Sequence, residues 1–186
     1  MKALKTRFFN TYYENGTVRH IKSGNIEIVR MIYAAVRDHN WGTIEPDITA
    51  EQITETENGF LINTRVLYYK SDIHFESDYT IIANDNRLIF EMTGRAHSTF
   101  NSNRTGICIL HPVKECAGKD CRVLNTDGLW EEVKFPEFIS PHQPVKNIRK
   151  MNWHPSPEIR ATLTFSGDIF ERSEEHTSEL QSRSDL

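Results

Sequence analysis

Hydrophobic and polar positions along this chain follow the two-residue period of β-strands in several segments, and few segments show the period of a helix. The clearest case is the segment 60–69, where Phe60, Ile62, Thr64, Val66 and Tyr68 fall on one face of an extended chain. β-Branched and aromatic residues recur in short runs that are separated by Gly, Asn, Asp and Pro. This pattern predicts a chain built almost entirely of β-strands.

Turn residues divide these runs into predicted hairpins. The pair Asn58-Gly59 predicts a tight turn in which both central residues take positive φ. Further turns are expected at 22–25, 84–86, 126–128 and 166–168. The strands expected around them are 26–36, 51–57, 60–69, 78–82, 88–92, 106–110, 122–124, 130–135 and 159–165. This spacing indicates an all-β fold, an antiparallel β-sandwich of the large, supersandwich-like kind.

Composition narrows the class of protein. The chain has 186 residues, of which 38% are hydrophobic, and no run approaches the ~18 apolar residues of a membrane span. The net charge of −4 argues against a nucleic-acid binder, because such domains usually carry a basic surplus. Three cysteines without a secretory signal favour a reducing compartment. We expect a cytoplasmic protein with neither a membrane nor a nucleic acid as partner.

The end of the chain breaks the β pattern. The string RSEEHTSELQS, at 172–182, is polar and resembles the translation of a common sequencing-library adapter. We therefore expect 172–186 to be a non-native tail, disordered or weakly helical. Residues 1–15 are expected to form an N-terminal extension, and 16–171 a β-sandwich domain that is truncated at its end.

Four residues offer ligands that zinc uses, namely Cys108, His111, Cys116 and Cys121. Their spacing is looser than a paired Cys-x2-Cys knuckle, and ordinary core and loop cysteines explain the same residues. We expect no metal site, with these four as the candidates if one exists. The sequence has no phosphate loop and no dinucleotide fingerprint, and we expect no cofactor.

Five residues are candidates for chemistry on a small molecule. His97 or His111 can act as a general acid if a Glu lies beside it, although an isolated His is more often structural. Asn103 and Arg104 offer donors for sugar hydroxyls, and Trp41 offers a ring that can stack on a sugar face. An ordered loop and ordinary packing are the structural explanations of the same three residues.

Four strings together resemble the N-terminal region of the D-apionate lactonase family: AVRDHNWGTI at 35–44, NRTGICILHP at 103–112, SPHQP at 140–144 and LTFSGDIFE at 163–171. The resemblance covers about 16–171. It implies a bacterial carbohydrate-catabolic hydrolase that opens D-apionolactone to D-apionate. It also implies a (β/α)8-like barrel after the β domain, so the partners would be a sugar-derived lactone and the missing barrel.

Whether this chain is itself an enzyme stays open at this point. The resemblance implies that its full-length relatives are lactonases and that the fragment alone is inactive. One alternative is a non-catalytic carbohydrate-binding or scaffolding module, which predicts exposed aromatic residues on one sheet face. Another is a mutarotase-like epimerase, which requires His97 or His111 beside a Glu in a concave pocket.

Overall fold

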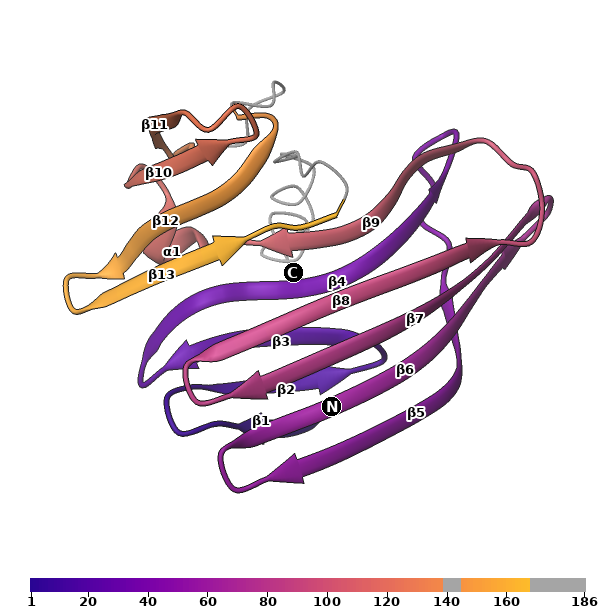
Figure 1. Ribbon diagram of the computed structural model, residues 1–186, viewed down its shortest axis with the longest axis horizontal. Coiled ribbons are helices and arrows are strands. Elements are labelled where there is room, and N and C mark those ends of the chain that lie inside the picture. Colours follow the sequence, from indigo (N-terminus) through magenta and orange to yellow (C-terminus); the bar gives the residue numbers. More distant parts are fainter. Residues whose placement is uncertain (139–144, 168–186) are drawn as a thin grey trace. The chain divides into compact units, whose positions relative to one another are not determined.

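The computed structural model describes residues 1–138 and 145–167 (Figure 1). Within these residues the chain contains strands and one short helix. Their bounds are β1 Lys2–Lys5, β2 Asn10–Glu14, β3 Thr17–Ser23, β4 Ile26–Asp38, β5 Pro46–Thr56, β6 Gly59–Lys70, β7 Ile73–Asn84, β8 Arg87–Ala96, β9 Ser102–Leu110, α1 Val113–Cys116, β10 Asp120–Asn125, β11 Trp130–Lys134, β12 Ile148–Ser156 and β13 Ile159–Thr164. The predicted all-β class is confirmed.

The chain divides into two compact units where one sandwich domain was expected. The first unit comprises Met1–Asn25 and Val29–Ile109, and the second comprises Ile26–Ile28 and Leu110–Leu186. Each unit is built around β-strands. No helix in the described part of the chain is long and apolar enough to cross a membrane.

Two sheets form the first unit, and Figure 1 shows them as separate layers. One has the order β1-β2-β3-β4-β9, and the other has the order β5-β6-β7-β8. Neighbouring strands of the second sheet are antiparallel throughout. Along β7 every second side chain is buried, from Ile73 to Ala83, because successive side chains of a strand point to opposite faces. The inward side chains of β7 therefore pack into a core, and most of its outward side chains are polar.

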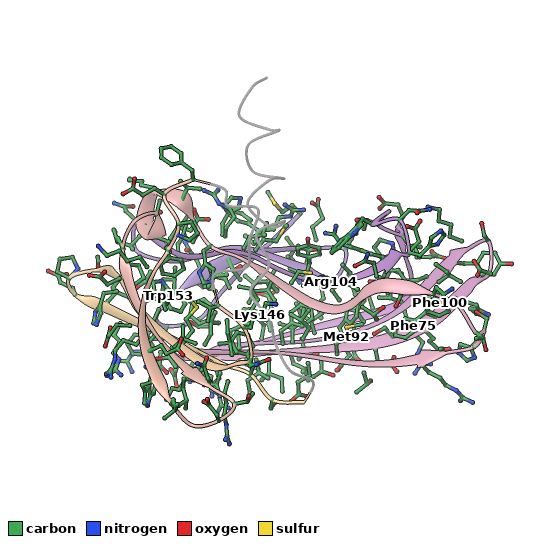
Figure 2. The ribbon with its side chains drawn as sticks, turned by 90° about the horizontal axis from the view of Figure 1, so that it is seen from above. Phe75, Met92, Phe100, Arg104, Lys146 and Trp153 are labelled. Carbon is green, nitrogen blue, oxygen red and sulfur yellow. The ribbon has the colours of Figure 1, made fainter. Side chains whose placement is uncertain are left out.

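The core of the first unit is aliphatic and aromatic. Val36 and Ile44 pack with Val66, Tyr68 and other buried residues, and partly buried Met92 and Phe100 extend the cluster. Phe75 contacts Phe100 edge-on at 6.4 Å between ring centroids, and Figure 2 labels both residues together with Met92. Each large side chain of this kind stabilises the fold by about 1.5–3 kcal/mol when fully buried.

Polar groups inside this core are satisfied by one another. The Tyr13 hydroxyl donates to Glu51 Oε2 at 2.6 Å and accepts from the Gly16 N–H at 3.0 Å. It also lies 2.9 Å from Thr64 Oγ1, which must then be the donor because the phenol has a single proton. The Tyr68 and Tyr79 hydroxyls are hydrogen-bonded to each other. Two β-strand layers are thus linked by hydrogen bonds as well as by apolar contact.

The second unit has one four-stranded sheet of order β11-β10-β12-β13, whose pairs are antiparallel. Cys116 of α1 and Cys121 of β10 are buried, as are Val123 and Trp153. The bond from Lys119 Nζ to the Pro155 carbonyl, at 3.2 Å, ties the start of β10 to β12.

Strand β5 forms one edge of the second sheet of the first unit. It begins at Pro46, and its pairing with β6 shifts register between Ile48 and Ala50, which is a β-bulge. Most of its side chains are exposed, including the carboxylates of Asp47 and Glu55. The proline, the bulge and the exposed side chains are typical of an edge strand, which has a partner strand on one side only.

Most predicted strands are present, and several are longer than expected. The hairpin between β5 and β6 is confirmed, but its turn residues are Glu57 and Asn58, since Thr56 pairs with Gly59. Neither turn residue has positive φ, so the expected Asn58-Gly59 turn is wrong. Glycine is needed at 59 for another reason, because a Cβ there would lie 1.8 Å from the carbonyl oxygen of Ala83.

An N-terminal extension and a non-native C-terminal tail were expected at the two ends of the chain. Residues 1–15, expected as an extension, contain β1 and β2, which pair with each other and continue into the five-stranded sheet. The tail 172–186 lies outside the described residues, as does the string at 140–144. The non-native character of that tail stays a prediction.

Candidate functional site

The connection between β4 and β5 presents Trp41 on the surface of the first unit. Asp38 ends β4, and its Oδ1 accepts hydrogen bonds from the backbone N–H groups of Asn40 and Gly42 at 2.9 and 2.8 Å. The Trp41 N–H donates to the Asp38 carbonyl at 3.1 Å, which closes the turn. An Asp at the start of a turn typically accepts such bonds. One carboxylate therefore shapes the whole loop.

Lys70, at the end of β6, fixes the second oxygen of this carboxylate. Its Nζ lies 2.9 Å from Asp38 Oδ2. The hydrogen bond from Lys70, with those from the backbone of Gly42 and Asn40, holds the pKa of Asp38 below its usual range. Gly42 is required here because a Cβ would lie 2.6 Å from Asp38 Oδ2.

Within this loop Trp41 is held in an uncommon conformation. Its φ is 68°, in the left-handed region that bulky residues rarely adopt, and 45% of its surface is exposed. Arg104 of β9 places its guanidinium carbon 5.6 Å from the centroid of the indole ring, within the range of a cation–π contact. Figure 2 labels Arg104. Asn103 is exposed, and as the next residue on the strand it points to the opposite face.

Of the three predicted substrate-binding residues, the structure thus brings together Trp41 and Arg104 and separates Asn103 from them. Sequence reasoning missed Asp38 and Lys70, which position the loop. The signal for Asp38 was available, since an Asp followed by Asn40 and Gly42 is typical of a side-chain-capped turn. No local signal pointed to Lys70, which is 32 residues away in sequence.

His97 lies just beyond β8 and meets a carboxylate on the outer face of the sheet. Its Nε2 is 3.1 Å from Glu76 Oε2, and the two side chains are 30% and 32% exposed. Glu76 Oε1 is also 3.6 Å from Arg65 Nε, and Arg65 contacts Asp78 at 2.9 Å. The ion pairs with Asp78 and Glu76 raise the pKa of Arg65. The required His–Glu pair therefore exists, but its carboxylate is shared with a cation.

A second histidine ring packs on the first. The His74 and His97 ring centroids are 4.8 Å apart with an interplanar angle of 33°, and Tyr69 meets His74 edge-on at 5.7 Å. The backbone N–H of His97 donates to the His74 carbonyl at 2.8 Å. These contacts orient the His97 ring toward Glu76. An imidazole beside a carboxylate is the combination of side chains that acid–base chemistry uses.

His111 lies in a different environment, inside the second unit. Its ring contacts Phe135 at 5.0 Å and Trp153 at 5.2 Å, both in edge-on geometry, and Figure 2 labels Trp153. Such packing is typical of a structural histidine. The catalytic role considered for His111 stays a prediction.

The four candidate zinc ligands belong to both units of the chain. Cys108 is buried at the end of β9, whereas Cys116 and Cys121 are buried in the second unit with His111 nearby in sequence. Across the described ranges 1–138 and 145–167, no three His, Cys, Asp or Glu side chains lie in positions that hold a metal ion. The three cysteines are buried, as small apolar side chains often are, and the absence of a metal site stays a prediction.

The antiparallel sheets of the first unit define an all-β sandwich protein. The chain matches the N-terminal domain of D-apionate lactonase over residues 2–176. It therefore belongs to the D-apionate lactonase family, which confirms the resemblance and extends it at both ends. The β1 and β2 strands thus lie within the matched region.

A curated relative is named D-apionate lactonase and comes from Brucella anthropi. It is 29% identical over 174 residues, which cover 92% of this chain and 29% of the relative. The chain therefore spans less than a third of the length of that relative. No solved structure matches the chain.

Proposed function

We propose that this chain is the N-terminal β portion of a carbohydrate-catabolic lactone hydrolase that opens D-apionolactone to D-apionate. In that reaction water adds to the lactone carbonyl, the ring C–O bond breaks, and the ring oxygen leaves as a hydroxyl. The observation that carries the proposal is the family match over 2–176. The name of the Brucella anthropi relative supports the substrate.

We further propose that the chain has no lactonase activity of its own. Lactone opening needs a nucleophilic water, a base to activate it and donors for the developing oxyanion, all within about 3 Å of one carbon. The His97–Glu76 pair is half-exposed on a sheet face, and Glu76 also contacts Arg65. The catalytic groups are therefore assigned to a following barrel, where chemistry lies at the C-terminal ends of the strands.

A chimera tests both statements. Residues 2–171 of this chain replace the matching segment of the Brucella anthropi lactonase, and the chimera is assayed on D-apionolactone beside the intact relative and the purified 186-residue chain. We expect the intact relative and the chimera to open the lactone and the chain alone to show no turnover. Lactone opening by the chain alone contradicts its proposed inactivity. A folded but inactive chimera contradicts the lactonase assignment.

One observation favours a second candidate, a mutarotase-like epimerase. His97 Nε2 lies 3.1 Å from Glu76 Oε2, and a His beside a Glu offers an acid and a base for sugar-ring opening. Polarimetry of D-glucose mutarotation with the 186-residue chain tests it. The epimerase is supported if the chain accelerates mutarotation and His97→Gln removes the acceleration. It is excluded if the chain leaves the spontaneous rate unchanged.

A further inference from the structure

We propose that Trp41 and Arg104 form a binding site for a five-carbon sugar acid or its lactone. This inference rests on the proposed lactonase function, which supplies the substrate class. It goes further by locating a contact for that substrate in the β portion rather than in the catalytic barrel. The site lies entirely within the first unit, between the β4–β5 loop and β9.

The presentation of Trp41 is the first argument. An indole that is 45% exposed contributes little to the core, yet the loop keeps it at a φ of 68°. Backbone strain of this kind persists only where surrounding contacts impose it, and it clusters at ligand-binding positions. Here the contacts are those of Asp38 with the Asn40 and Gly42 N–H groups. The loop thus holds a half-exposed aromatic ring at the surface of the first unit.

The partner of the ring is the second argument. The guanidinium carbon of Arg104 lies over the indole ring, 5.6 Å from its centroid, so a planar cation and an aromatic ring stand together in the first unit. The C–H face of a sugar ring can pack on indole, while guanidinium N–H groups donate to a carboxylate or to ring oxygens. A guanidinium carries five N–H donors in a planar fork, a geometry that matches a carboxylate. The combination fits a small ring that carries an acid or lactone group.

The neighbouring carboxylate does not oppose an anionic ligand. Asp38 precedes the loop at the end of β4, and its two oxygens are directed at Lys70 and at the backbone N–H groups of Asn40 and Gly42. Its charge is thus balanced by the Lys70 ammonium at 2.9 Å. Asp38 and Lys70 act as positioning residues, since they hold the loop and not the ligand.

The chain offers a matched internal control. Trp130 of β11 is 41% exposed, and Arg122 of β10 lies 5.1 Å from its ring centroid. Arg122 Nε is bound to Glu132 Oε1 at 2.6 Å across the strand pair. Cross-strand contacts of this type stabilise a sheet. This second Trp–Arg pair therefore has the same chemistry in a structural setting, and no ligand is assigned to it.

Titration of the 15N-labelled, 186-residue chain tests the site. D-Apionate is added while the indole N–H signals are followed by NMR, each assigned with a Trp→Phe variant, and neutral D-apiose serves as a comparison ligand. We expect D-apionate to shift the Trp41 signal saturably and to leave Trp130 unchanged. Trp41→Ala and Arg104→Gln should each weaken binding about tenfold, the effect of one lost charge-assisted contact, whereas Trp130→Ala and Arg122→Gln should not.

Three results would overturn the inference: an unmoved Trp41 signal, equal weakening by the Trp130→Ala control, or D-apiose binding as tightly as D-apionate. The last result would remove the sugar-acid assignment. The outcome is independent of the chimera assay. If the chimera turns over the lactone but D-apionate does not bind at Trp41, the binding-site inference is wrong and the lactonase proposal stands. If D-apionate binds at Trp41 but the folded chimera is inactive, the lactonase proposal is wrong and the binding site stands.

Discussion

The two faces of β7 carry hydrogen-bonded ionisable groups in adjacent positions, and they differ in what those groups contribute. On the inner face, Tyr79 is 3% exposed and its hydroxyl bonds to Tyr68. On the outer face, Asp78 bonds to Arg65 at 2.9 Å, with side chains 50% and 56% exposed. Both pairs have good geometry. The comparison shows that burial, more than the presence of a hydrogen bond, decides how much such a pair contributes to the free energy of unfolding.

The pKa shifts follow the same division. Burial is the largest cause that raises the pKa of Tyr79, Tyr68 and Tyr13, in the last case to about 12. Ionisation of these phenols would place a charge between the two layers. On the outer face the raised pKa of Arg65 instead comes from its partners Asp78 and Glu76. The inner network is thus part of the folded core, whereas the outer network lies on the exposed surface.

Replacing Tyr79 should have the largest effect. Tyr79→Ala removes a buried ring that contacts Phe90 and leaves the Tyr68 hydroxyl without its partner. We expect a loss of about 3–5 kcal/mol in the free energy of unfolding, measured by urea denaturation. Asp78→Ala, the adjacent outer-face control, should cost less than about 1 kcal/mol. Similar losses for both variants would remove the distinction between the faces.

The second largest loss of stability is expected from a substitution on the closely packed inner face of β8. A Cβ at Gly94 would lie 2.2 Å from Cζ of Phe75, whose ring is held in the core. Gly94→Val should therefore lower the free energy of unfolding by about 3 kcal/mol through overpacking. Thr93→Val, on the outer face of the same strand, should change it by only about 0.5 kcal/mol. Thermal denaturation of the two variants compares them directly.

Tyr13→Phe tests the buried hydroxyl. It leaves Glu51, Thr64 and the Gly16 N–H without their common partner, and we expect a cost of about 1–3 kcal/mol near pH 7. A folded pKa of about 12, above the ordinary value of 10, means that stability is fully present below pH 10 and is lost as the pH rises through 12. The variant should therefore lose less stability above pH 10 than the unmodified chain. An unchanged alkaline slope would contradict the shifted pKa of Tyr13.

Arg65→Gln should have the smallest effect. It breaks the exposed contacts with Asp78 and Glu76, and such surface pairs contribute about 0–1 kcal/mol. The difference from the unmodified chain should shrink further in 1 M NaCl, where the Debye length is about 3 Å. A loss above about 2 kcal/mol that persists in salt would show that the outer network is as important as the inner one.

The parts of the fold that local patterns could predict are those with clear alternation. The β6 strand alternates over most of its length, and the pairings of β5 with β6 and of β7 with β8 were anticipated from turn residues. Strands β1 and β2 were not, because their lysines and exposed polar residues surround single buried side chains such as Leu4 and Tyr13. Strand β12 was missed as well, since Pro155 falls inside it.

For the candidate site, local sequence predicted the residue types but not which residues meet in space. Trp41 and Arg104 were recognisable by residue type, but their proximity depends on the path of β4 and β9. The partner of His97 could not be named in advance, because Glu76 reaches it through the β7–β8 register, in which Glu76 pairs with Arg95. Local sequence identifies groups that can do chemistry, while strand register decides which of them meet.

The edge strand β5 has a consequence for how the molecule behaves among its own copies. An unpaired strand edge is a template on which another chain can add a strand and begin an aggregate. On β5 the proline at 46, the bulge near Ile48 and the exposed carboxylates of Asp47 and Glu55 each interfere with such addition. The polar, irregular sequence that makes β5 look like a poor strand is therefore what lets this sheet end in solvent without recruiting another sheet.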